Sequence, residues 1–146
     1  MNVIVLFESM TGNTHEAADR IAAGLDGAGH TVTALCRPKD LDLQLLAEAD
    51  LVVVGTWTDG IFVFGQRPAH GPRLGAIPYM VGKKAAVFCT YALNPGKTIP
   101  KLTAIVEQRG GTVVHGAALH RKKLPNATAD FVVALLGALE KGSATA

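Results

Sequence analysis

Apolar and polar positions along the chain fall into blocks that predict strands and helices in turn. Residues 3–7 are continuously apolar and mostly β-branched, which is typical of a central parallel strand covered on both faces. The next segment has apolar residues at helical spacing with charged residues between them, namely Ala17, Ala18, Ile21, Ala22 and Leu25. A buried strand therefore leads into an amphipathic helix through the short loop Ser9–Thr14.

The same pattern continues to the end of the chain. Further strands are predicted over residues 30–36, 50–56, 83–90 and 112–119, and the first of these is placed at a sheet edge because it alternates weakly. Helices are predicted over residues 41–48, 98–109 and 127–141. Five strands separated by helices indicate the α/β class, with a doubly wound five-stranded parallel sheet and helices on both faces.

Length and composition indicate one domain of ordinary size. The chain has 146 residues, of which 49% are hydrophobic and 18% charged, which excludes a disordered protein. We expect one domain over residues 1–141 and a flexible tail over 142–146. No apolar run approaches the ~20 residues of a membrane span, and the chain enters a strand without a basic leader, so we expect a cytoplasmic protein without a membrane partner.

Charge and cysteine content exclude several other classes. The formal net charge of +2 is too small to favour nucleic acid as a partner. Cys36 and Cys89 lie far apart in strand-like stretches, so they are interpreted as small buried apolar residues rather than as a disulfide or a metal site. The histidines are too dispersed for a metal site. No nucleophile with a base and no carboxylate pair stands out, so no catalytic residue is predicted.

The loop after the first strand is the best candidate for an anion site. At a strand-to-helix turn the first helical N–H groups lack partners and the helix dipole is positive, so a phosphate fits without lysine or arginine. Hydroxyl groups add donors, and glycine allows close approach. The alternative is an ordinary helix cap by Asn13 or Thr11. A cap needs one Ser, Thr or Asn, and this loop has four such residues. The whole loop is therefore the candidate phosphate site, with residues Ser9, Met10, Thr11, Gly12, Asn13 and Thr14.

Two other loops follow central strands and should meet the first one at the carboxyl edge of the sheet, where ligands bind in such folds. One contains the single tryptophan and the other one of the two tyrosines, which suits a phosphorylated planar ligand. Trp57 either stacks on that ligand or packs its loop, and Thr56 and Thr58 either donate to phosphate or close a turn. The candidates are Thr56, Trp57, Thr58, Asp59 and Gly60, with Thr90, Tyr91, Ala92, Asn94 and Gly96.

The loop Ser9-x-Thr11-Gly12-Asn13-Thr14 resembles the Thr/Ser-x-Thr-Gly-x-Thr phosphate loop of the flavodoxin family, and the order of elements matches over nearly the whole chain. The resemblance implies a flavodoxin-like fold of the short-chain type with strand order 2-1-3-4-5, and noncovalently bound FMN. It also implies that the peptide before Gly60 turns toward the reduced flavin. The Gly-x-Gly-x-x-Gly turn of dinucleotide-binding domains is absent.

An FMN-binding redox protein that transfers electrons is the function that these features favour. The alternatives are an FMN-dependent oxidoreductase acting on a small substrate such as a quinone, and a non-redox interaction module on the same fold. Flavodoxins that carry electrons are typically acidic, whereas this chain is slightly basic and has Arg121, Lys122 and Lys123 after its last strand. We therefore expect a redox partner protein with an acidic or apolar surface.

Overall fold

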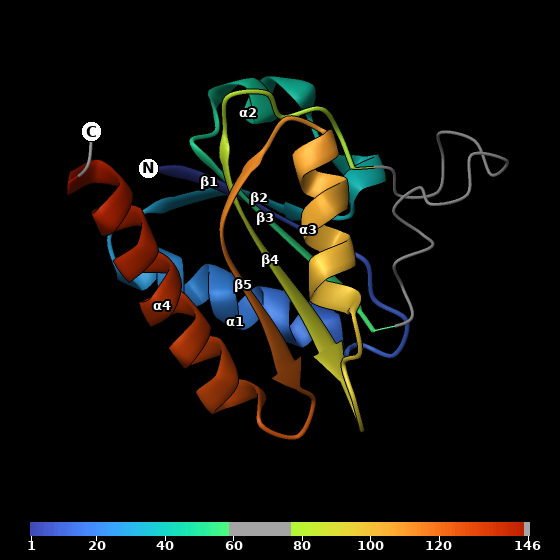
Figure 1. Ribbon diagram of the computed structural model, residues 1–146. Helices are drawn as coiled ribbons and strands as arrows, with labels where there is room; N and C mark the ends of the chain where they lie inside the picture. The colour runs from blue at the N-terminus through green and yellow to red at the C-terminus, as the bar shows by residue number, and fades with distance from the viewer. Residues whose placement is uncertain (59–76, 145–146) are drawn as a thin grey trace, which may run out of the picture.

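The computed structural model describes residues 1–58 and 77–144 of the chain (Figure 1). Within them, five strands form one sheet in which all neighbouring pairs are parallel. The strand order is β2-β1-β3-β4-β5, which confirms the predicted topology. The strands are β1 (Asn2–Phe7), β2 (Thr31–Cys36), β3 (Leu51–Trp57), β4 (Lys84–Tyr91) and β5 (Thr112–His120).

Helices cover both faces of this sheet (Figure 1). They are α1 (Asn13–Gly27), α2 (Leu43–Glu48), α3 (Thr98–Gln108) and α4 (Leu124–Ala144), with a short 3₁₀ helix η1 (Pro38–Asp40). Because side chains alternate along a strand, Val3 and Val5 of β1 pack with α1 and α4, whereas Ile4 and Leu6 pack with α2 and α3. The predicted α/β arrangement with helices on both faces is therefore confirmed.

A glycine in the middle strand leaves room for an aromatic ring on the face of the sheet that α4 covers. Gly55 of β3 is paired with Phe88 of β4, and a Cβ at Gly55 would lie 1.9 Å from the Phe88 ring. The Phe88 ring therefore lies over the glycine, and Phe131 of α4 meets it edge-on at 5.9 Å between centroids. Phe88 and Phe131 belong to the core that the sheet shares with α1 and α4. Gly55 lies directly beneath the Phe88 ring.

Several element ends differ from the prediction. Trp57 and Tyr91 are the last residues of β3 and β4 rather than loop residues, because the sheet continues through the pair Trp57↔Thr90. α4 begins at Leu124, three residues before the predicted start, since proline is tolerated in a first helical turn and Pro125 stands there. The same helix extends to Ala144, through residues 142–144 that the sequence assigned to a tail.

The amino edge of the sheet holds both ends of the described chain. Met1 lines one cavity together with Leu136, Leu139 and Glu140 of α4, and Figure 1 shows the two ends on the side away from the arrowheads of β4 and β5. No helix in residues 1–58 or 77–144 combines the length and apolar character needed to span a membrane. Both cysteines are free thiols, with Cys36 half-buried and Cys89 buried.

Candidate functional site

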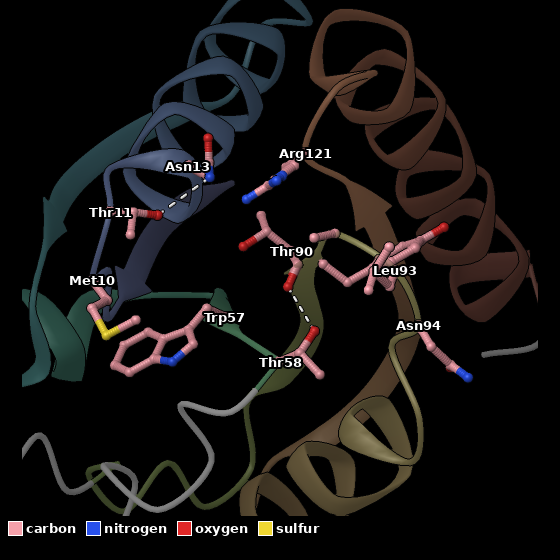
Figure 2. Close-up of a pocket in the computed structure, with 11 residues that line it drawn as sticks. Met10, Thr11, Asn13, Trp57, Thr58, Thr90, Leu93, Asn94 and Arg121 are labelled. Carbon is pink, nitrogen blue, oxygen red and sulfur yellow. Dashed lines mark hydrogen bonds between the residues drawn. The ribbon is translucent and has the colours of Figure 1, made fainter.

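A pocket opens at the carboxyl edge of the sheet, where the chain segments after β1, β3, β4 and β5 meet (Figure 2). Its volume is about 360 Å³, within the range of roughly 300–1,000 Å³ that is typical of small-molecule sites. The residues that line it are Met10, Thr11, Asn13, Trp57, Thr58, Thr90, Tyr91, Ala92, Leu93, Asn94 and Arg121. The pocket thus unites the three loops that the sequence analysis selected.

The loop between β1 and α1 turns sharply at a glycine. Gly12 has φ +94°, a conformation that side chains rarely adopt, and a Cβ there would meet no atom within 4 Å. Backbone conformation, and not space, therefore requires glycine at this position. The Gly12 N–H donates to Ser9 Oγ at 3.1 Å, and the His15 N–H donates to the same oxygen at 3.4 Å. Ser9 thus holds the loop in shape from outside the pocket.

The first turn of α1 carries free donors. Gly12 is the N-cap residue and makes no capping bond through a side chain. The Asn13 side chain donates instead to Thr11 Oγ1 at 3.3 Å (Figure 2), so neither Asn13 nor Thr11 caps the helix as the simpler alternative supposed. In the described part of the chain, the backbone N–H groups of Asn13 and Thr14 have no acceptor. These N–H groups and the positive end of the helix dipole favour an anion.

A buried pair of hydroxyl groups joins α1 to the sheet below the pocket. Thr14 Oγ1 and Thr90 Oγ1 lie 2.8 Å apart, and the two residues are 1% and 4% exposed. Thr90 also lines the pocket, so its position at the end of β4 is fixed by the first turn of α1. The hydroxyl of Thr14 therefore acts in this structure as a link between elements.

The segments after β3 and β4 are also tied together. The Thr58 N–H and the Thr58 hydroxyl both donate to the Thr90 carbonyl, at 3.0 and 2.8 Å (Figure 2). The Thr98 hydroxyl lies 3.0 Å from the Thr58 carbonyl and 2.8 Å from the Pro95 carbonyl, and can donate to either. In the loop between them, the Gly96 N–H donates to Asn94 Oδ1 at 2.8 Å. The pocket edge is therefore built from a connected set of hydrogen bonds.

Some predicted site residues lie away from the pocket or outside the description. Thr56 is fully buried, is paired with Cys89 across the sheet, and has a hydroxyl without a partner among the described residues. Gly96, at φ +56°, shapes its loop and does not line the pocket. Asp59 and Gly60, with the peptide turn expected there, lie outside the described residues.

Apolar side chains stand at the mouth of the pocket. Met10 is 71% exposed and Leu93 is 97% exposed, and Figure 2 shows Met10 beside Trp57 on the side of the pocket away from Leu93. Tyr91 is half-buried, with its ring edge-on to His120 at 5.1 Å between centroids. The pocket thus combines polar groups near α1 with aromatic and aliphatic side chains farther out.

Two residues of this pocket were not among the predicted site residues. Leu93 lies inside a selected loop but is apolar and has no recognisable ligand chemistry. Arg121 follows β5, and the rule that places ligands at carboxyl strand ends applies to that strand as well. The position of Arg121 after the last predicted strand was therefore the signal that could have identified this residue.

Burial shifts the pKa of two titratable groups near the site. Burial raises the pKa of the Glu8 carboxyl, against the opposing effect of Arg37 and Lys39. Burial also raises the pKa of the Cys89 thiol to about 11. That thiol stays protonated at neutral pH, which excludes it as a nucleophile there.

The fold and the pocket define a class of protein. A doubly wound sheet places its ligand at the carboxyl edge where strand order reverses, which in this chain lies beside β1 and β3. A free helix N-terminus at that point suits a phosphate, and flanking aromatic rings suit a planar group. The structure is that of a mononucleotide-binding α/β domain.

Comparison with known proteins finds similarity to flavodoxins. The family model for flavodoxin matches residues 5–73, which include the phosphate loop and the end of β3. The flavodoxin of Megasphaera elsdenii is 26% identical over 125 residues, which cover 86% of this chain and 90% of that protein. The chain is thus similar to flavodoxins over the matched residues and to one flavodoxin over most of its length, and this likeness implies FMN as the cofactor.

Solved structures agree on the fold. The crystal structure of oxidised flavodoxin 1 from Bacillus cereus has a TM-score of 0.65 at 21% identity, covering 94% of this chain and 98% of that one. A short-chain flavodoxin associated with a bacterial microcompartment has a TM-score of 0.67 at 17% identity, covering 94% and 97%. At these identities the likeness concerns the fold alone.

Proposed function

We propose that this protein binds FMN noncovalently in the pocket and transfers electrons between partner proteins. The observation that carries the proposal is the uncapped first turn of α1, where the N–H groups of Asn13 and Thr14 have no acceptor among the described residues. A phosphate there would receive charge-assisted hydrogen bonds and the favourable helix dipole. Bound FMN would supply the redox chemistry, and the chain supplies position and electrostatics.

Different residues would hold the two ends of the cofactor. The loop Ser9–Thr14 would hold the phosphate, with donors from the backbone and from the exposed Thr11 hydroxyl. Trp57 and Tyr91 line the same pocket, and either ring can cover a face of the flavin. Thr90 and Asn94 also line the pocket and would provide polar groups for the remainder of the cofactor. Asp59 and Gly60 stay candidates for the ring by the family resemblance alone, because they lie outside the described residues.

Electron transfer is favoured over catalysis on a small substrate. The thiol of Cys89, the residue before Thr90 in β4, is buried with a pKa of about 11, and among the described residues no cluster of His, Cys, Asp or Glu is arranged to bind a metal. The pocket wall of described residues includes no carboxylate or histidine that would act as an acid or base. The residues present thus suit holding a cofactor.

The partner of this carrier would have an acidic or apolar surface. Met10 and Leu93 expose apolar side chains at the pocket mouth, and Lys122 and Lys123 are exposed in the turn after β5. An acidic protein would be attracted to that turn and would pack its apolar groups beside the pocket. Two free thiols agree with a reducing compartment, so we place the protein in the cytoplasm.

The test is a comparison of FMN with riboflavin. Both contain the same ring, and only FMN has the phosphate, so the full chain without cofactor should bind FMN more tightly by about tenfold or more. Quenching of flavin fluorescence measures both dissociation constants. Equal affinities would reject the phosphate loop, and a failure to bind either flavin would reject the proposed function.

A further inference from the structure

Arg121 lines the pocket and has no carboxylate partner within residues 1–58 and 77–144. Its backbone N–H donates to the Tyr91 carbonyl at 2.9 Å, which fixes the start of the turn after β5 beside the end of β4. Figure 2 shows the side chain reaching from the end of β5 toward Asn13 and Thr90. The ion pairs found among the described residues are His15 with Asp19 and Arg20 with Glu16, and neither involves Arg121.

The guanidinium of Arg121 and the amino end of α1 both bring positive charge to this part of the pocket. The guanidinium of Arg121 approaches the side where the first turn of α1 presents its unpaired N–H groups, and the described pocket wall has no acidic residue to separate them. Cations are unfavourable beside a helix N-terminus unless an anion lies between. An arginine placed there is consistent with a ligand that contributes negative charge.

We propose that Arg121 binds the phosphate of FMN and makes this site selective for phosphorylated flavins, an inference that rests on the proposed function. The planar guanidinium can donate two parallel hydrogen bonds to phosphate oxygens, as an ammonium cannot. Asn13 is the first residue of α1, and Thr90 is bonded to Thr14 in the same turn. The direction of the side chain thus favours the phosphate over the flavin ring.

The inference also changes the interpretation of the basic turn. Arg121, Lys122 and Lys123 follow one another in sequence and are all exposed, but of the three only Arg121 lines the pocket. By this inference Arg121 binds the cofactor, and Lys122 and Lys123 are free to contact a partner protein. A substitution of Arg121 should therefore act on cofactor affinity in the absence of any partner.

The experiment measures FMN and riboflavin affinity in the full chain and in three variants. Arg121→Gln should weaken FMN binding about tenfold at low ionic strength and leave riboflavin binding unchanged. Arg121→Lys keeps the charge but not the paired donors, so it should recover part of the loss. Lys101→Gln is the control, because it removes one exposed positive charge from the first turn of α3 without touching the pocket. It should bind both flavins as the unmodified protein does.

A second readout uses inorganic phosphate as the probe. Phosphate added to the cofactor-free chain should shift the amide resonances of Asn13 and Thr14, and Arg121→Gln should reduce that effect. Equal weakening of FMN and riboflavin by Arg121→Gln would place the guanidinium on the ring and overturn the inference. Unchanged affinity for both flavins would overturn it as well, while normal FMN binding by the unmodified chain would leave the proposed function standing.

Discussion

At the scale of single residues, the half-buried His115 places an unsatisfied polar atom inside the fold. Its ring packs on Phe131 of α4 at 5.1 Å between centroids, and its Nε2 is buried without a partner among the described residues. Burial lowers the pKa of this histidine below its usual 6.5. A buried polar atom without a hydrogen bond costs about 1–3 kcal/mol, so the site is unfavourable even when the ring is neutral.

We expect His115→Leu to remove an acid-sensitive contribution to stability. Because the folded pKa is lowered, the unfolded chain takes up the proton first, and stability present above the usual pKa is lost as the pH falls through the folded one. The variant should be more stable than the unmodified protein by about 1 kcal/mol at neutral pH, and the gap should widen in mild acid. Urea unfolding at both pH values measures it, and parallel pH profiles would contradict it.

At the scale of elements, the contact between β3 and β4 depends on one glycine. The Phe88 ring occupies the space where a Cβ of Gly55 would lie, and both strands are central in the sheet. We expect Gly55→Ala to destabilise the protein by about 3 kcal/mol, since neither buried strand can move aside.

A double-mutant cycle separates this contact from other effects. With Phe88→Leu in the background, the added methyl group has more room, so Gly55→Ala should cost less than it does alone. The free energies of unfolding of the two single variants and the double variant give the coupling. Additive costs would show that the ring is not what excludes a side chain at position 55.

The start of α1 provides a matched pair of glycines. Gly12 has positive φ and Gly27, the last residue of the same helix, does not, and an added Cβ would meet no atom at either. Gly12→Ala should therefore strain the phosphate loop by about 1 kcal/mol or more and weaken FMN binding about fivefold. Gly27→Ala should leave FMN affinity unchanged. Fluorescence titration measures the FMN affinity of both variants. Equal affinities would show that the backbone conformation at Gly12 does not affect FMN binding.

The sequence predicted elements well where the signal was local. Continuous apolar strands and helical spacing predicted a parallel sheet with helices on both faces, whereas the strand order was implied by the resemblance of the loop Ser9–Thr14 to the flavodoxin phosphate loop. The extension of β3 through Trp57 was not predictable, since it depends on pairing with Thr90 in a distant strand. Likewise Thr58 and Thr98 interact through space across 40 positions. Arg121 was missed because its role follows from where β5 ends relative to α1.

At the scale of the whole molecule, the exposed lysines after β5 bear on the partner proposed above. The net charge is only +2, but Lys122 and Lys123 are exposed next to Arg121, which lines the pocket. We expect the double variant Lys122→Gln/Lys123→Gln to react several-fold more slowly with an acidic redox protein at low ionic strength. High salt should abolish the difference because exposed charges are screened.

Stopped-flow reduction at a series of ionic strengths measures this effect. FMN affinity serves as the internal control, since neither lysine lines the pocket. A double variant that reacts at the same rate as the unmodified protein at every ionic strength would show that the partner approaches from another side.

The placement of both chain ends at the amino edge of the sheet makes the domain modular. Met1 and the last turns of α4 share a cavity there, whereas the pocket is lined by residues at the carboxyl ends of β3 and β4, at the opposite edge of the sheet. A second redox domain tethered through either end would leave the pocket uncovered. With a linker long enough to reach around the sheet, the tether would convert a bimolecular encounter into an intramolecular one at high effective concentration. Electron delivery would then no longer depend on the concentration of a free partner.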